Sequence, residues 1–210
     1  MGGIILIKFI TLEGGEGCGK TTVANKLSEE LQKIGFKTLC TREPGGVELS
    51  EKIRSLLLNN SMTPEAEALL FAASRAELVN NKIKPAIENN YIVICDRYID
   101  SSLVYQGYVR GLGVERVYDI NMFATNGLLP DLTIYLDLPP EVAVKRVNCR
   151  NEDKNRFDKE SLDFYHRVRC GFKDITDMYS DRIVEIDASK PLDEVVSNCI
   201  EVVLKRGGVI

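Results

Sequence analysis

The sequence predicts an α/β fold in which a parallel sheet is covered by helices on both faces. Five short apolar runs alternate with stretches of helical periodicity along the chain, and the first run leads directly into a glycine-rich loop. Near-continuous apolar strands separated by helices are typical of parallel sheets that are buried on both faces. Because no repeat or Pro/Gly/Ser-rich linker divides the chain, we expect a single domain of residues 1–210.

The five apolar runs are the expected strands. They are IILIKFITL from Ile4, FKTLC from Phe36, YIVIC from Tyr91, LTIYLDL from Leu132 and RIVEID from Arg182. After the first run, apolar residues recur at steps of four, four and three, namely at Val23, Leu27, Leu31 and Ile34. This spacing predicts a helix with one buried face. The alternation predicts three layers, with a five-stranded parallel sheet flanked by helices.

A second helix is expected over PEAEALLFAASRAELV, residues 64–79. One face, at 100° per residue, is small and apolar and is expected to pack on the core: Ala66, Leu69, Leu70, Ala73 and Ala76. Phe71 and Arg75, one turn apart, point roughly the opposite way. This pair suits a base that stacks on Phe71 and accepts a hydrogen bond from Arg75. The pattern leaves open that Phe71 packs under a neighbouring helix or at a subunit interface.

The composition is that of an ordinary globular protein. With 44% hydrophobic residues, 28% charged residues and a net charge of -4, the chain has no Lys/Arg run that suggests binding to a nucleic-acid polymer. The six cysteines are never closer than 21 positions, which argues against CxxC sites and favours free thiols. Lys8 interrupts the N-terminal apolar run, and no run approaches a membrane-spanning length of about 18 residues. We therefore expect a cytoplasmic protein.

The strongest motif is a complete Walker A sequence, Gly14-x4-Gly19-Lys20-Thr21, between the first strand and a helix. Its glycines let backbone N–H groups point at phosphates, and the helix N-terminus adds partial positive charge. Lys20 is expected to reach the outer phosphates of ATP, and the Thr21 hydroxyl is expected to bind Mg²⁺. The expected ATP contacts are Gly14, Gly15, Glu16, Gly17, Cys18, Gly19, Lys20, Thr21 and Thr22.

A second motif ends the strand that starts at Tyr91. Asp96 resembles a Walker B acid, whose carboxylate would support Mg²⁺ at the carboxyl edge of the sheet. Arg97 follows immediately and places a cation in the same crevice. A structural ion pair at the strand end is the alternative that the pattern leaves open.

The other motifs favour a kinase that phosphorylates a nucleoside monophosphate. No aspartate has a glycine three positions later, and neither NKLS nor NKIK ends in an acid, so a signalling GTPase is disfavoured. A monophosphate is largely dianionic near pH 7, since its second pKa is about 6, and its transfer site needs cations more than a general base. The chain has one histidine, His166, but several arginines in or beside candidate loops: Arg42, Arg54, Arg97, Arg150 and Arg156.

A polar stretch from Asn148 to Arg156, NCRNEDKNR, lies between two helical patterns. It is either a solvated loop or a mobile lid that carries Arg150 and Arg156 to the reacting phosphates. Spacing alone does not choose between these two interpretations.

Several motifs in order give the chain a family resemblance. They are EGGEGCGKTT, TREPGG, LLFAASR, DRYIDSSLVYQG and PDLTIYLDLPPEVAVKR. With these segments the chain resembles the bacterial thymidylate kinases from about Phe9 to the C-terminal helix. The resemblance implies a P-loop NTPase-like fold, usually as a homodimer, and transfer of a phosphoryl group from ATP to dTMP with Mg²⁺.

The resemblance also implies roles for residues at matching positions. Phe71 would stack on thymine, and Arg75 would donate to its exocyclic oxygen. Tyr105 would crowd the sugar where a ribose carries its 2′-hydroxyl, and Glu16 would contact the deoxyribose 3′-hydroxyl. The other expected dTMP contacts are Ser102 and Gln106 along the base edge, and Arg54, Arg97 and Glu43, with Arg42 beside them, at the monophosphate.

Residues 15–18 are Gly-Glu-Gly-Cys and lack the arginine that some family members place in this loop. The resemblance therefore implies that a lid at about residues 146–157 supplies the charge, with Arg156 the best match and Arg150 second. The expected catalytic residues are Lys20, Arg97, Arg156, Arg150 and Glu16. Two alternatives remain, a kinase for another monophosphate or a deoxynucleoside, and a non-catalytic ATP-binding switch.

Overall fold

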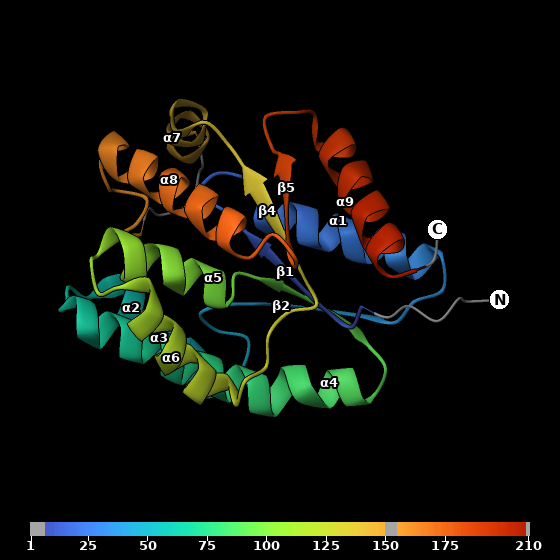
Figure 1. The fold of residues 1–210 in the computed structure, drawn as a ribbon, viewed down its shortest axis with the longest axis horizontal. Helices are drawn as coiled ribbons and strands as arrows, with labels where there is room; N and C mark the ends of the chain where they lie inside the picture. Colours follow the sequence, from blue (N-terminus) through green and yellow to red (C-terminus); the bar gives the residue numbers. More distant parts are fainter. Residues whose placement is uncertain (1–6, 150–154, 209–210) are drawn as a thin grey trace.

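The computed structural model describes residues 7–149 and 155–208. Its centre is one parallel sheet with the strand order β2-β3-β1-β4-β5 (Figure 1). The strands are β1 Phe9–Glu13, β2 Thr38–Arg42, β3 Ile92–Asp96, β4 Leu132–Asp137 and β5 Ile183–Asp187. All five overlap the predicted apolar runs, and β1, β2 and β3 continue one or two residues beyond them, to Glu13, Arg42 and Asp96. The strands β1, β3 and β4 are buried along their whole length. The predicted α/β fold is confirmed.

Helices cover both faces of the sheet. α1 (Lys20–Lys33) packs against α9 (Leu192–Arg206) over one face, and α8 (Leu162–Met178) lies over the other (Figure 1). The remaining helices are α2 Glu48–Asn59, α3 Pro64–Leu78, α4 Lys84–Glu88, α5 Ile99–Ser102, α6 Val114–Thr125 and α7 Pro140–Asn148, with π-helical segments at Val79–Ile83 and Leu103–Val109. No helix in the described part of the chain is both long enough and apolar enough to cross a bilayer.

The strand order places two motifs at one edge of the sheet. β1 lies between β3 and β4, and Leu12 of β1 pairs with Asp96 of β3. The loop that follows β1 therefore opens beside the end of β3. Crevices at the carboxyl ends of parallel strands, where the strand order reverses, are the usual ligand sites of such sheets.

The predicted buried stripe of α1 is correct except at its end. Val23, Leu27 and Leu31 are almost completely buried, but Ile34 is 49% exposed. The reason is that α1 ends at Lys33 and Gly35 follows with a φ of 96°. The chain turns away before the next helical position would reach the core.

The predicted core face of α3 is wrong. Leu69 is 58% exposed and Ala73 is exposed, whereas Arg75, expected on the opposite face, is only 1% exposed. The inward-facing residues of α3 are Glu67, Ala68, Ala72, Ser74, Arg75 and Leu78. The two charged side chains can be buried here because each has a partner in another segment: Arg75 pairs with Glu43, and Glu67 pairs with Arg156. The small apolar face is left outside.

Candidate active site

The loop between β1 and α1 passes close to other backbone segments at two positions, and only glycine fits at either of them. Gly14 has a φ of 143°, and a Cβ there would lie 2.7 Å from the carbonyl oxygen of Leu136. Gly17 has a φ of 79°, and its Cβ would lie 2.8 Å from the carbonyl oxygen of Ala143. Positive φ and this crowding exclude larger residues. The glycines of the motif therefore hold the loop in its wrapped shape.

Lys20 lies inside that loop, and the expected metal ligands touch one another beside it. The Nζ of Lys20 donates to the carbonyl oxygens of Gly14 and Gly15 at 3.1 and 2.8 Å. The hydroxyl of Thr21 donates to Oδ2 of Asp96 at 2.5 Å. A cavity, here called the loop cavity, has Gly19, Lys20, Thr21, Thr22 and Asp96 in its lining. A hydroxyl and one carboxylate suit Mg²⁺, which keeps several waters and takes its other ligands from phosphates.

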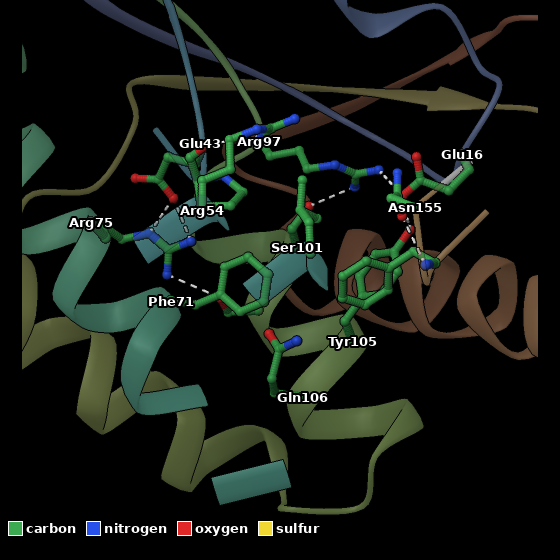
Figure 2. A pocket seen from close by; sticks show the side chains of 14 residues that line it. Glu16, Glu43, Arg54, Phe71, Arg75, Arg97, Ser101, Tyr105, Gln106 and Asn155 are labelled. Carbon is green, nitrogen blue, oxygen red and sulfur yellow. Dashed lines mark hydrogen bonds and ion pairs between the residues drawn. The ribbon is translucent and has the colours of Figure 1, made fainter. Parts of the chain in front are cut away.

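A second cavity, here called the aromatic cavity, adjoins the first. Its lining includes Phe71, Arg75, Ser102, Tyr105, Gln106 and Phe157. Figure 2 shows the rings of Phe71 and Tyr105 on one side and the guanidinium of Arg97 above them. Four charged residues line both cavities: Glu16, Glu43, Arg54 and Arg97. The two cavities therefore meet at a cluster of opposite charges.

Arg97 stands at that meeting point in a constrained conformation. Its φ is 70°, which is uncommon for a side-chain-bearing residue. The guanidinium donates to the Gly14 carbonyl oxygen at 2.9 Å, to Ser101 Oγ at 3.1 Å and to Glu16 Oε1 at 2.5 Å, and it lies over the ring of Tyr105. Burial disfavours the charge and is the largest single effect, but Glu16, Tyr105 and the nearby carboxylates together outweigh it and raise the pKa of Arg97. The cation is thus fixed and permanent.

Arg75 is held by the protein itself. Its Nε donates to Glu43 Oε2 at 2.7 Å, and Nη2 lies 2.5 Å from the same oxygen. Its other partners are Ser102 Oγ, Asn121 Oδ1 and the carbonyl oxygen of Tyr98. All five N–H donors of the guanidinium have partners in the protein. A thymine oxygen would therefore have to share an N–H group with one of these partners. The expected contact of Arg75 with the base stays a prediction.

The lid arginine lies elsewhere than expected. Arg156 was predicted at the reacting phosphates, but its Nη1 pairs with Glu67 Oε2 at 2.6 Å and its Nε donates to the Leu57 carbonyl oxygen at 2.6 Å. It lines neither cavity, whereas its neighbours Asn155 and Phe157 do. The reason is that Glu67 offers a buried carboxylate within reach. Arg150 lies outside the described residues.

Sequence reasoning missed a third hollow, which borders the glycine-rich loop at Gly17, Cys18 and Gly19. Cys18 and Thr22 line it together with Arg146, Ala188 and Lys190. Both Nη atoms of Arg146 lie 3.3 Å from the carbonyl oxygen of Ala188. The predicted lid range begins at Arg146, but Arg146 lies in α7. Its signal was present in the motif PEVAVKR, and only the fold brings it to the loop.

Glu13, just before the loop, is fully buried beside the turn that follows β3. Its two oxygens accept from Tyr98 N at 2.7 Å and Ser101 Oγ at 2.5 Å. Burial, with a smaller contribution from Asp100, raises the pKa of Glu13 from 4.5 to about 7. The carboxyl group therefore supports the turn that carries Arg97 and titrates near neutrality.

This titration predicts a pH-dependent stability. Below pH 4.5 Glu13 is protonated in both states, and between 4.5 and about 7 only the unfolded state releases the proton, so folding loses stability as the pH rises. In Glu13→Gln the amide oxygen can accept from Tyr98 N and the amide nitrogen can donate to Ser101 Oγ, so both contacts are possible without the charge. Relative to this variant, the wild type is expected to lose about 3 kcal/mol of unfolding free energy between pH 4.5 and 7.5. Urea titrations measure it, with the exposed Glu29→Gln as control; equal pH profiles would contradict it.

Comparisons with known proteins show which family the chain is similar to. The family model described as Thymidylate kinase matches residues 12–199. The chain is 47% identical to a thymidylate kinase of Geobacillus thermodenitrificans, over 94% of this chain and 90% of that protein. It is 50% identical to one of Thermoanaerobacter pseudethanolicus, over 94% and 98%. Among solved structures, the thymidylate kinase of Ehrlichia chaffeensis matches with a TM-score of 0.76 and 34% identity, covering 92% of this chain and 97% of that one.

Proposed function

The chain belongs to the thymidylate kinase family and phosphorylates dTMP with ATP, and we propose that the two nucleotides meet end to end at Arg97. One observation carries this proposal: the loop cavity and the aromatic cavity share Glu16, Arg54 and Arg97. A donor triphosphate in one and an acceptor phosphate in the other would come into line between them. Such alignment and charge neutralisation provide most of the catalysis in phosphoryl transfer.

The donor half is proposed to use the loop and Mg²⁺. Backbone N–H groups of residues 14–19 and the Nζ of Lys20 would hold the phosphates. Thr21 and Asp96 would hold Mg²⁺, which neutralises charge on the phosphates when bound. The hollow beside Arg146 shares Gly19 and Thr22 with the loop cavity and no lining residue with the aromatic cavity. The planar guanidinium of Arg146 suits stacking on the donor base.

The acceptor half is proposed to hold thymine against Phe71. Tyr105 would lie against the sugar, and Arg97 with Arg54 would hold the monophosphate. The dianionic phosphate needs no general base, and the described residues place no histidine at either cavity. We propose that the predicted segment at about 146–157 acts as a lid in its part beyond the end of α7 at Asn148. The support is that Asn155 lines both cavities and Phe157 lines the aromatic cavity. Arg156 would leave Glu67 and act on the phosphates only after the base is bound, because in this structure it pairs with Glu67.

Phe71→Ala is expected to weaken acceptor binding without changing donor binding. Phe71 is half-buried. It lines the aromatic cavity but not the loop cavity. Base stacking on an aromatic contributes about 1–3 kcal/mol, so the Kd for dTMP should rise about tenfold or more while the Kd for ATP stays unchanged. Isothermal titration measures both. Equal losses of both affinities would place Phe71 in a packing role.

A panel of acceptors tests the function. ADP release with ATP and each of dTMP, dGMP, CMP and thymidine should be fastest with dTMP. Faster turnover of dGMP or CMP would favour a kinase for another monophosphate. No transfer to any acceptor would favour an ATP-binding switch. The neutralising cluster around Arg97 argues against the switch, because binding alone does not require it.

We also propose that the enzyme is a homodimer that acts in the cytoplasm, where both nucleotides are available. The support for the dimer is the exposed apolar face of α3, with exposed neighbours on α2 and α6. Phe123 is 91% exposed, Leu69 58% and Leu56 51%, and α3 packs against both α2 and α6. Large side chains exposed together on adjacent helices mark an interaction surface. A second copy would cover it with the same face.

Leu69→Glu is expected to dissociate this dimer. A carboxylate brought into a buried apolar interface loses its hydration without a partner. Sedimentation should give twice the chain mass of 23.5 kDa for the wild type and the single mass for the variant. Leu162→Glu, at an exposed leucine on α8, is the control and should stay dimeric. A wild-type monomer would refute the proposal.

A further inference from the structure

Behind the aromatic cavity lies a carboxylate that the proposed function does not use. Glu67 of α3 is 2% exposed. Its Oε1 accepts a hydrogen bond from Gln106 Nε2 at 2.7 Å, and its Oε2 pairs with Arg156 Nη1 at 2.6 Å. Arg110 adds a weaker contact, with Nε 3.8 Å from Oε1. Charge-assisted bonds of this kind are short and directional, so Glu67 is held in one orientation.

This carboxylate decides which atom Gln106 shows to the cavity. An ionised carboxylate only accepts hydrogen bonds, so the amide group of Gln106 must turn its nitrogen toward Glu67. Gln106 is 2% exposed and lines the aromatic cavity. Within the described residues, no donor pairs with its Oε1. The carbonyl oxygen is therefore the amide atom left to face a ligand.

That polarity distinguishes the two kinds of pyrimidine. Thymine carries an N–H at N3 between two carbonyl oxygens, whereas cytosine carries a lone pair at N3 and an amino group at C4. An amide oxygen at the base edge accepts from the N3–H of thymine. Facing cytosine, the same oxygen meets a lone pair and is left without a partner. Leaving a buried polar group unpaired costs more than a hydrogen bond contributes.

We propose that Glu67 is a positioning residue for base specificity: it fixes the amide of Gln106 so that the site accepts thymine and rejects cytosine. Glu67 touches no substrate and acts through Gln106. The proposal rests on the proposed function, because it assumes that the base lies in the aromatic cavity. It adds a residue behind that cavity, and this residue determines which base the cavity accepts.

Glu67→Gln is expected to invert the amide rather than merely weaken it. The new side chain has one carbonyl oxygen and one amino group. Arg156 is the closer cation, so it should hold the oxygen of the new glutamine and leave its amino group toward Gln106. The oxygen of Gln106 would then turn to that amino group. Its own NH₂ would face the cavity, where it suits N3 of cytosine and opposes N3–H of thymine.

The readout is the ratio of kcat/KM for dTMP to kcat/KM for dCMP with ATP. In Glu67→Gln this ratio should fall at least about tenfold, since one exchanged hydrogen bond is worth about a factor of ten. The matched control is Glu65→Gln, which removes an exposed carboxylate from the same helix and should leave the ratio unchanged. The single variant Gln106→Leu and the double variant with Glu67→Gln complete a double-mutant cycle. Without the amide, the second substitution should not change the ratio further.

Two outcomes would overturn the inference. One is a Glu67→Gln enzyme whose rates with dTMP and dCMP fall by the same factor, which is what loss of structure alone produces. The other is a Glu67→Gln effect on the ratio that persists in the Gln106→Leu background. A wild type that shows no preference for dTMP would instead refute the proposed acceptor site, so the two failures are distinguishable.

Discussion

Replacing Arg97 with asparagine is expected to lower kcat for dTMP phosphorylation about 10³-fold. Arg97 and Arg54 are the two arginines that line both cavities. Of these, Arg97 has its guanidinium fixed by Gly14, Ser101 and Glu16. Asparagine removes the charge but tolerates the left-handed backbone that Arg97 adopts. The loss should therefore appear in turnover and in KM for dTMP, with little change in the thermal unfolding midpoint.

The control for this variant is Arg206→Asn, which removes an exposed arginine at the end of α9 that lines neither cavity. Steady-state rates and thermal melts of both variants decide the matter. An Arg97→Asn enzyme whose kcat is within about threefold of wild type would show that transition-state charge is neutralised elsewhere. A large fall in the melting midpoint would instead assign Arg97 a structural role.

Arg75→Met is expected to cost about 3–5 kcal/mol of unfolding free energy. The side chains of Arg75 and Glu43 are only 1% and 2% exposed, so removal of one leaves the other buried without a counter-charge. Burial already raises the pKa of Glu43, and Arg75 opposes that rise. Without Arg75 the folded-state pKa rises further, and stability is lost as the pH rises through it. The variant should therefore be more destabilised at pH 8 than at pH 5.

Urea denaturation at the two pH values measures both effects. Adding Glu43→Gln to Arg75→Met removes the uncompensated charge and should restore part of the lost stability and remove its pH dependence. An Arg75→Met variant within about 1 kcal/mol of wild type would mean that the pair contributes nothing net, which is known for some buried pairs replaced by apolar residues.

Local patterns were sufficient for the sheet and the phosphate loop. Each strand is a compact apolar run, and the glycines and Lys20 of the loop are neighbours in sequence. These features depend on short-range chemistry, namely burial of a strand and the backbone freedom of glycine. The order of strands and the meeting of the loop with Asp96 then follow from the topology of a parallel sheet.

The errors concern contacts between distant segments. Periodicity identified an apolar face of α3 but could not tell whether the core or a second molecule covers it, and Leu69 lies outside. Arg75 is buried because Glu43, 32 positions away, neutralises it. The position of Arg156 depends in the same way on Glu67. A helical projection contains no information about such partners, so the polar side of a helix can be its inner side.

The most direct measurement is a crystal structure with dTMP, Mg²⁺ and a non-hydrolysable ATP analogue bound together. It should show the thymine ring against Phe71, the acceptor phosphate at Arg97 and the γ-phosphate at Lys20, with the two phosphates in line. A thymine bound outside the aromatic cavity, or an Arg97 that contacts neither nucleotide, would contradict the account.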